Sequence, residues 1–187
     1  MIKKENFTIA NIAGLVKGLF ILKSKSSYVG SLPRIRGKLY FKVKGNVKIG
    51  NRFLARSIMY PSAITVDEKA ELVIGDNVFL NYGVDIGCTK SITIGDYTKV
   101  GPFTVIVDSN YHQIQCGEDV VSAPVEIGRN VWIGRSCIIL PGVSIGDNSV
   151  IASGSVVTRD IPSNVLVAGS PAMEKRALKI DENWIRR

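Results

Sequence analysis

His112 is the side chain best suited to acid–base chemistry in this sequence. It is the only histidine among the 187 residues, and it follows Asp108, Ser109, Asn110 and Tyr111 in a polar stretch. Imidazole exchanges a proton near neutral pH, so a histidine in such a segment can act as a general base toward a hydroxyl group. A single histidine is more often structural, but its place in a long polar segment favours catalysis.

The three cysteines do not form a reactive or metal-binding set. Cys88, Cys116 and Cys137 are far apart and show neither the spacing of a zinc site nor an even-numbered disulfide framework. We expect free thiols in a reducing compartment and no metal ion. We also expect no cysteine nucleophile, because none of the three has a partner base.

An aliphatic residue recurs at every sixth position in the second half of the chain. A period of six fits neither an α-helix, which needs a spacing near 3.6, nor a simple strand, which needs a spacing of 2. The unbroken series is Ile127, Ile133, Ile139, Ile145, Ile151 and Val157, and the same stride occurs at Ile74, Leu80 and Ile86 and at Ile94, Val100 and Ile106.

A flat face followed by a corner explains the six-residue stride. Three such faces close a triangular coil of 18 residues, in which the aliphatic residue points inward and stacks on its equivalent in the next coil. Glycine, asparagine and aspartate supply the turn conformations at the corners. The repeat therefore predicts an all-β fold, a parallel β-helix over residues 45–172.

Two segments flank the repeat, and one interrupts it. Residues 1–44 form a basic extension, with an amphipathic helix expected over 2–22 and a strand over 34–48. Pro171 predicts a short C-terminal helix within residues 173–187. The stride is broken between Ile106 and Ile127, so we expect an active-site loop over residues 107–124.

Positive charge is concentrated at the N-terminal end. The formal net charge is +8, yet residues 1–60 hold thirteen lysines and arginines against the single acid Glu5. This asymmetry indicates that the N-terminal third contacts an anionic partner, such as a membrane surface, an acidic polymer or a phosphate carrier. No apolar run reaches the roughly 18–20 residues of a membrane span, and no signal peptide is evident. We therefore expect a cytoplasmic protein, with the inner face of the membrane as a candidate location.

The repeat units resemble those of the hexapeptide-repeat acetyltransferase family. Ile-Gly-Asp-Asn-Val at 74–78 and Ile-Gly-Asp-Asn-Ser at 145–149 carry the resemblance, which extends over the region 45–172. The family's coil is left-handed, so the resemblance implies a left-handed parallel β-helix and a homotrimer. The loop histidine, together with Val-Trp-Ile-Gly at 131–134, is similar to the sugar O-acetyltransferase branch, which includes galactoside, maltose and xenobiotic acetyltransferases.

This branch implies an O-acetyltransferase that uses acetyl-CoA. By resemblance, His112 matches the loop histidine that removes the acceptor's proton, and Asn81 matches an asparagine that holds the acceptor. Trp132 matches the tryptophan that lines the thioester channel. The other cofactor positions that the resemblance implies are Arg135, Ser153, Gly154, Thr158, Arg159 and Arg176.

The loop departs from the galactoside branch. That branch has Thr-x-x-His-Pro, whereas this chain has Asp108 followed by three residues, His112 and Gln113. The departure resembles polysaccharide and capsule O-acetyltransferases, so the expected acceptor is a sugar or a bacterial surface-glycan precursor. Asp108 is the candidate to orient His112, with Glu118 and Asp119 on the far side of the loop as alternatives.

Two other functions stay open. An N-acetyltransferase acting on a nucleotide-linked amino sugar would use the same base and cosubstrate. A non-catalytic β-helix that scaffolds a partner belongs to a different class, and the joint presence of Asn81, His112 and Trp132 argues against it. A γ-type carbonic anhydrase shares the fold but needs three histidines for zinc, which excludes it. No nucleic-acid partner is expected.

Overall fold

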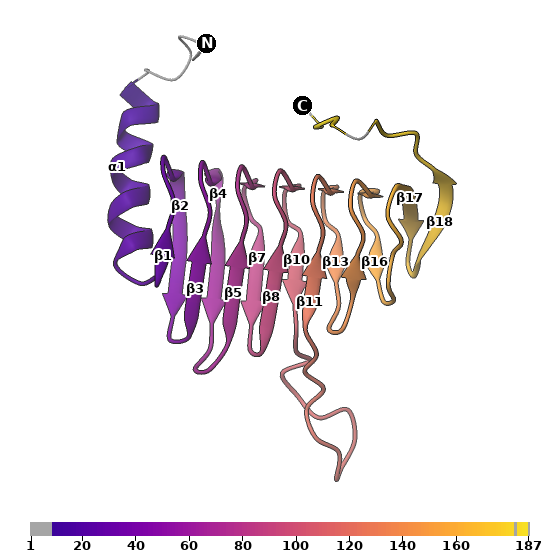
Figure 1. The fold of residues 1–187 in the computed structure, drawn as a ribbon. Helices are drawn as coiled ribbons and strands as arrows, with labels where there is room; N and C mark the ends of the chain where they lie inside the picture. Colours follow the sequence, from indigo (N-terminus) through magenta and orange to yellow (C-terminus); the bar gives the residue numbers. More distant parts are fainter. Residues whose placement is uncertain (1–8, 182, 187) are drawn as a thin grey trace.

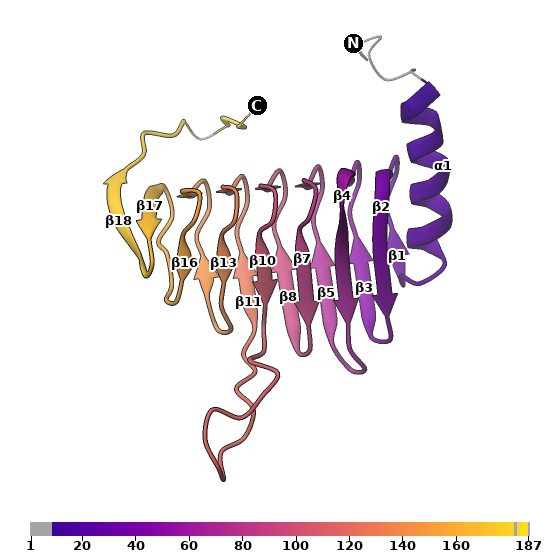
Figure 2. The ribbon, with the colours of Figure 1, turned by 180° about the vertical axis from the view of Figure 1, so that it is seen from behind.

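The computed structural model describes residues 9–181 and 183–186 and shows a triangular prism of stacked parallel coils (Figures 1 and 2). We name its three faces A, B and C in chain order. Face A holds β1 (Tyr28–Val29), β3 (Asn46–Ile49), β5 (Glu71–Ile74), β8 (Ser91–Ile94), β11 (Val125–Ile127) and β14 (Ser144–Ile145). Face B holds β6 (Phe79–Leu80), β9 (Lys99–Val100), β12 (Trp132–Ile133), β15 (Val150–Ile151) and β17 (Val165–Gly169). Face C holds β7 (Asp85–Cys88), β10 (Val105–Val107), β13 (Ile138–Ile139) and β16 (Val156–Val157).

Two long strands, β2 (Arg34–Val43) and β4 (Leu54–Val66), continue around the corner between faces B and C. β4 pairs with β6 through Leu54–Ala55 and with β7 through Ala63–Val66. β2 pairs with β4 on both sides of this corner. The stacking of the coils therefore extends into the basic N-terminal segment.

The inward-facing aliphatic residues stack in register from coil to coil. On face A, Ile94 pairs with Ile127 and Ile127 with Ile145. On face C, Ile106 pairs with Ile139. All five side chains are at most 2% exposed and belong to one continuous core. The parallel β-helix predicted from the six-residue stride is confirmed.

Asparagine occupies the corner between faces A and B in three successive coils. Asn130, Asn148 and Asn164 have φ angles of 57°, 61° and 60°, in the left-handed region that asparagine tolerates better than most residues. Nδ2 of Asn130 donates to Oδ1 of Asn148 (2.8 Å), and Nδ2 of Asn148 donates to Oδ1 of Asn164 (3.0 Å). These three residues form an asparagine ladder that runs along one edge of the prism.

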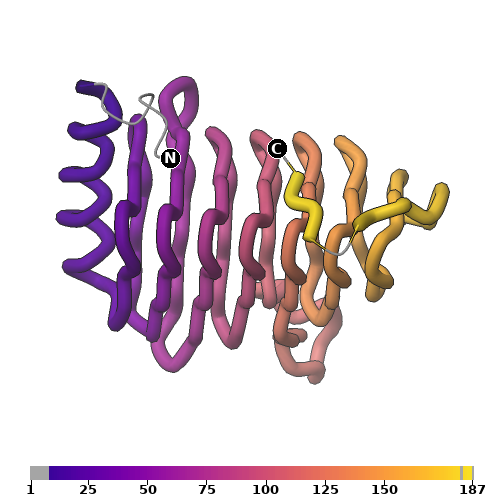
Figure 3. The backbone as a smooth tube through the Cα atoms, turned by 45° about the horizontal axis from the view of Figure 1, so that its top comes forward, coloured from indigo at the N-terminus to yellow at the C-terminus, as the bar shows by residue number. Residues whose placement is uncertain are grey.

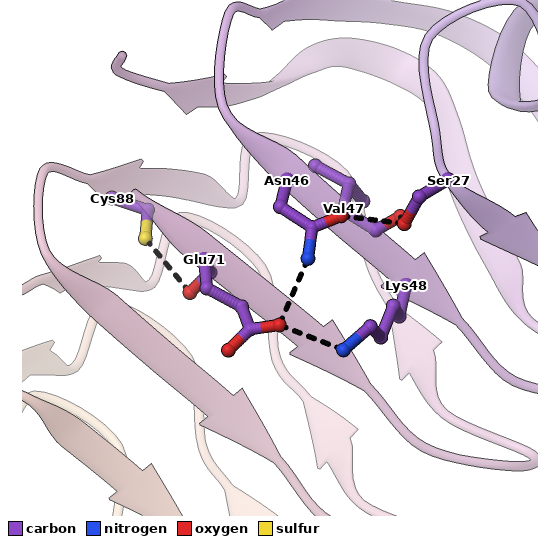
Figure 4. A network of polar contacts seen from close by, with 6 residues as sticks. All are labelled: Ser27, Asn46, Val47, Lys48, Glu71 and Cys88. Atoms are coloured by element: carbon purple, nitrogen blue, oxygen red, sulfur yellow. Dashed lines mark hydrogen bonds and ion pairs between the residues drawn. The ribbon is translucent and has the colours of Figure 1, made fainter. Parts of the chain in front are cut away.

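Outward-facing polar side chains join the first coils on face A (Figure 4). The Glu71 carboxylate accepts hydrogen bonds from Lys48 Nζ (2.8 Å) and Asn46 Nδ2 (2.9 Å). Ser27 Oγ donates to Oδ1 of Asn46 (2.5 Å). The hydrogen bond and charge of Lys48 lower the pKa of Glu71. The pair is solvent-exposed, so its contribution to stability is small.

The predicted N-terminal helix is present as α1 (Ile9–Lys23), and the predicted residues before Ile9 lie outside the described part. The helix packs along β2 and buries Gly14, Gly18 and Leu22. A Cβ at Gly18 would collide with the carbonyl oxygen of Pro33, so glycine is required for this close approach. Within residues 9–181 and 183–186, no helix combines the length and apolar character that crossing a membrane requires.

The predicted C-terminal helix is wrong. Ala172–Ala177 instead form β18, which pairs antiparallel with β17, and no helix follows it in the described residues. The free edge of β17 offers unpaired backbone groups, and pairing with the next segment satisfies them. This tertiary pairing outweighs the helix-start signal at Pro171.

Candidate functional site

The loop between β10 and β11, residues 108–124, leaves the corner between faces C and A and projects away from the prism (Figure 1). Asp108 is fully buried at its base. Its carboxylate accepts hydrogen bonds from the backbone N–H groups of Thr89 (2.7 Å), Lys90 (2.8 Å) and Ser91 (2.8 Å). Thr89 Oγ1 donates a fourth (2.9 Å). A carboxylate held by four donors fixes the direction in which the loop leaves the coil.

Asp108 is thus tied to the turn at residues 89–91 and does not contact the His112 ring. The imidazole of His112 is exposed and has no hydrogen-bond partner in the described part of this chain. Glu118 accepts a hydrogen bond from Gln115 Nε2, and Asp119 is exposed. None of the three candidate carboxylates orients His112 within one chain.

Tyr111 anchors the segment that carries His112. Its φ angle is 59°, which is uncommon for a bulky residue. Its ring lies against β7, where a Cβ at Gly87 would collide with the phenolic oxygen. Burial, followed by the charge of Asp108, raises the pKa of Tyr111. The residue that precedes His112 is therefore held against the prism.

Asn81 lies at the other edge of face C, in the turn from β6 to β7. Its Oδ1 accepts a hydrogen bond from the backbone N–H of Tyr82 (2.9 Å), and its carbonyl oxygen accepts one from Ser62 Oγ (3.0 Å). β7 and β10 are parallel neighbours. Since Asn81 precedes β7 and His112 follows β10, the two residues lie at opposite edges of face C. One chain does not bring them together.

A cluster of aromatic rings lies beside Asn81 along the corner between faces B and C. The ring centroids of Tyr60 and Phe103 are 5.0 Å apart, and those of Tyr82 and Phe103 are 5.4 Å apart. Nη2 of Arg135 donates to Tyr82 Oη (2.7 Å), and its guanidinium carbon lies 5.5 Å from the Phe103 centroid. We name Tyr60, Tyr82, Phe103 and Arg135 the aromatic corner.

Only Arg135 of the aromatic corner was predicted from the sequence. Phe103 occupies a corner position with a φ angle of 58°, where glycine or asparagine is the usual residue. A large aromatic residue at such a position was the one feature of the sequence that could have indicated this cluster. Exposed rings beside a guanidinium offer apolar faces and hydrogen-bond donors to a polar ligand.

Two predicted cofactor residues continue the row from Arg135. Ser153 Oγ accepts a hydrogen bond from the Arg135 backbone N–H (3.1 Å), and the Gly154 N–H donates to the Arg135 carbonyl oxygen (2.8 Å). Gly154 has a φ angle of 75°, and a Cβ there would meet no atom within 4 Å. This corner is therefore open to an extended ligand.

The other predicted cofactor residues are dispersed over the surface. Trp132 is 47% exposed on face B. Thr158 and Arg159 are exposed after β16, at the corner between faces C and A, and Arg176 is exposed on β18. An open groove of about 870 Å³ lies along face A, and none of the predicted site residues line it.

The two buried thiols do not supply a nucleophile. Burial, followed by the charge of Asp108, raises the pKa of Cys88 to about 12, and burial raises the pKa of Cys137. Both thiols are therefore protonated at neutral pH and unreactive. Cys116 is exposed on the loop. The described residues contain no group of three or more histidine, cysteine, aspartate or glutamate side chains placed to hold a metal.

Comparison with known proteins identifies the family. A protein-family model described as "Bacterial transferase hexapeptide (six repeats)" matches residues 124–159 of this chain. The putative lipopolysaccharide biosynthesis O-acetyl transferase WbbJ of Escherichia coli (strain K12) is 30% identical over 151 residues, which cover 74% of this chain and 75% of that protein. The chain belongs to the hexapeptide-repeat transferase family.

Other members of the hexapeptide-repeat family have a higher sequence identity to this chain, but over a shorter region. Galactoside O-acetyltransferase of Escherichia coli (strain K12) is 45% identical over 101 residues, which cover 52% of this chain and 50% of that protein. The chain spans only 50–59% of the length of this and three further curated relatives. A structure of galactoside acetyltransferase in complex with coenzyme A superposes with a TM-score of 0.64 at 29% identity, covering 93% of this chain and 76% of that one. The family and the left-handed β-helix expected from the sequence are confirmed.

The position of Asp108 predicts a structural effect of its removal. In Asp108→Ala, four donors lose their acceptor, and each buried unsatisfied donor costs about 1–3 kcal/mol. We expect chymotrypsin to cut the native protein after Tyr111 at least about tenfold faster than in the wild type, as followed by mass spectrometry. Asp119→Ala makes the same change at an exposed position and should leave the rate unaltered. Equal rates in the two variants would show that Asp108 does not hold the loop.

Proposed function

We propose that this protein is an acetyl-CoA-dependent O-acetyltransferase that acts on a hydroxyl group of a sugar or of a bacterial surface-glycan precursor. The arrangement of face C carries the proposal. The exposed imidazole of His112 stands beyond one edge on a fixed loop, and Asn81 stands at the other edge beside the aromatic corner. Relatives named as galactoside and lipopolysaccharide O-acetyltransferases support this acceptor class.

A second copy of the chain would complete the site. His112 and Asn81 lie at opposite edges of face C, and the loop points away from its own prism (Figure 1). In a closed ring of three chains, each chain presents one surface to one neighbour and a different surface to the other. His112 of one copy then meets Asn81 of the next. We therefore propose a homotrimer with three equivalent sites between chains.

His112 would act as the general base. Its unprotonated ring nitrogen takes the proton of the acceptor hydroxyl while Asn81 holds the acceptor by a hydrogen bond. The acceptor oxygen attacks the carbonyl carbon of the acetyl thioester, and a backbone N–H group stabilises the oxyanion that forms. The carbon–sulfur bond then breaks, and the CoA thiolate leaves with the proton that the imidazolium returns. No covalent intermediate on the protein is needed.

Acetyl-CoA would lie along the open corner formed by Arg135, Ser153 and Gly154. This corner has exposed backbone groups and no side chain over Gly154. Trp132 would border the thioester end. The cations of Arg159 and Arg176, together with the Thr158 hydroxyl, suit the phosphate groups. These roles follow the family resemblance and the openness of the corner.

The base assignment predicts a large kinetic effect. In His112→Ala we expect acceptor-dependent release of CoA to fall by about 10²–10⁴-fold, because that is the usual contribution of a general base. The measurement is thiol release from acetyl-CoA with a panel of glycans and sugar nucleotides. Cys116→Ser should serve as the background, because the exposed Cys116 thiol would react with the reagent.

Gln113→Ala is the matched control for His112→Ala. Gln113 is the exposed neighbour of His112 on the same loop, and we expect its removal to change the rate less than about threefold. Equal rates in wild type and His112→Ala would reject the base assignment. An amino-sugar nucleotide that responds where hydroxyl acceptors fail would instead support the N-acetyltransferase alternative. Release of CoA without consumption of any acceptor would reject both.

We also propose that α1 rests on an anionic membrane surface. Its buried side carries Gly14 and Gly18, whereas its outward side is apolar and exposed. The outward residues, with exposed fractions of 50–87%, are Ile9, Ile12, Val16 and Phe20. Nine of the thirteen lysines and arginines counted over residues 1–60 follow the helix, within residues 25–60. An apolar helix face beside basic residues suits a bilayer interface that carries anionic lipid.

Vesicle flotation tests this contact. The wild type should float with anionic vesicles at low salt and not with zwitterionic ones, because the basic residues supply much of the attraction. Replacing Val16 and Phe20 by serine should reduce the bound fraction by about fivefold or more. Ile114→Ser, which removes a 74% exposed apolar residue from the loop, is the control. Equal flotation of the wild type and the Val16/Phe20 variant would contradict the proposal.

A further inference from the structure

The C-terminal tail, described at residues 178–181 and 183–186, folds back over the preceding coils (Figure 3). The Leu178 N–H donates to the carbonyl oxygen of Asn164 (2.7 Å). Further along, Nδ2 of Asn130 donates to the carbonyl oxygen of Trp184 (3.1 Å), and Oδ1 of Asn130 accepts from the Arg186 N–H (2.9 Å). The tail therefore follows the asparagine ladder and is held at both ends of it.

The tail forms an open pocket against face B. The pocket has a volume of about 690 Å³ and is lined by Lys99 on β9, Trp132 on β12, and Trp184 and Arg186 from the tail. Trp132 and Trp184 are 47% and 40% exposed. Two partly exposed indole rings that line one pocket can stack on a planar or ring-shaped group. We name these four residues the tail pocket.

Two cations meet in the tail pocket, and none of the described residues that line it is acidic. Lys99 Nζ donates to the carbonyl oxygen of Arg186 (2.5 Å), and Arg186 Nη2 donates to the carbonyl oxygen of Asn148 (3.0 Å). Nε of Arg186 is buried without a hydrogen-bond partner in the described structure. Burial, followed by the charge of Arg186, lowers the pKa of Lys99, and burial lowers the pKa of Arg186. Like charges that lose water together are stabilised by an anion between them.

The tail pocket lies close to the proposed acceptor residue. Lys99 pairs with Phe79 on the neighbouring strand, and Asn81 follows Phe79 by two residues, just after β6 ends. Strand spacing and rise place the backbones of Lys99 and Asn81 roughly 8 Å apart. A sugar held at Asn81 would therefore have its substituent within reach of the two cations.

We propose that the tail pocket binds the diphosphate of the acceptor, so that the acceptor is a diphosphate-linked sugar. The inference rests on the proposed acetyl transfer to a sugar. Lys99 and Arg186 bind the phosphate oxygens, and Trp184, with Arg186 stacked 4.9 Å from its ring centroid, covers the adjoining group. Diphosphate links sugars both to nucleosides and to lipid carriers, and either source fits this chemistry.

Tryptophan fluorescence tests the pocket directly, because the chain has two tryptophans and both line it. Inorganic diphosphate, uridine diphosphate and a short prenyl diphosphate are titrated separately. We expect saturable quenching by at least one of the two organic diphosphates, and the probe that responds identifies the source as nucleotide or lipid. Lys99→Gln and Arg186→Gln should each weaken binding by about tenfold or more.

Lys179→Gln is the matched control, since it removes an exposed cation from the same tail and should leave binding unchanged. Lys99 Nζ also holds the tail through the Arg186 carbonyl oxygen, so Lys99→Arg, which keeps the charge and a donor, should bind diphosphate within about threefold of the wild type. In the transfer assay, Lys99→Gln should raise KM for a diphosphate-linked sugar about tenfold and leave KM for acetyl-CoA unchanged.

The proposal would be overturned if no diphosphate quenched the fluorescence, or if Lys179→Gln weakened diphosphate binding as much as Lys99→Gln does. It would also be overturned if CoA quenched the fluorescence more strongly and Lys99→Gln abolished that quenching. The pocket would then belong to the acetyl donor. Diphosphate binding in a protein that transfers no acetyl group would support the pocket while rejecting the proposed function. The fluorescence and transfer assays therefore separate the two failures.

Discussion

Each coil of this protein buries its aliphatic row only against the coils on either side of it, and the rest of the structure depends on that stacking. Ile94, Ile127 and Ile145 illustrate the constraint, because a shift of one residue in any coil would move its aliphatic side chain out of the core. The fixed register in turn aligns the corners. The asparagine ladder and the aromatic corner are rows that run along prism edges because equivalent positions of successive coils must superpose.

The same register fixes the positions that polar side chains can occupy. Asp108 leaves the core row at the end of β10 and meets the turn at residues 89–91 of the preceding coil, so its carboxylate fixes the loop and is not available to the His112 ring. Asn81 and His112 stand on the two edges of face C for the same reason. A rigid prism cannot bend to bring its own edges together, and a site that needs both edges requires a second prism.

Much of the fold was predictable from the sequence, because a six-residue period encodes inward side chains directly. The interruption between Ile106 and Ile127 likewise located the loop. The contacts made across coils were not visible in the sequence. Asp108 was assigned to His112, its neighbour along the chain, although its partners are contributed by the coil before it. The C-terminal helix was predicted from Pro171, although the free edge of β17 offered strand pairing. The rings of the aromatic corner were not predicted, because the only indication in the sequence was that Tyr60 and Phe103 are large residues at corner positions.

We propose that one chain supplies His112 and a neighbouring chain supplies Asn81 to the same site. Co-expression of His112→Ala and Asn81→Ala chains with different tags, followed by purification through both tags, tests this sharing of the site. Every trimer that carries both tags has one of its three sites with both native residues, so the mixed protein should recover about a third of wild-type acetyl transfer. Each variant alone should stay near background. Activity of the mixture no greater than the mean of the two variants would contradict the claim, because it would place both residues of each site in a single chain.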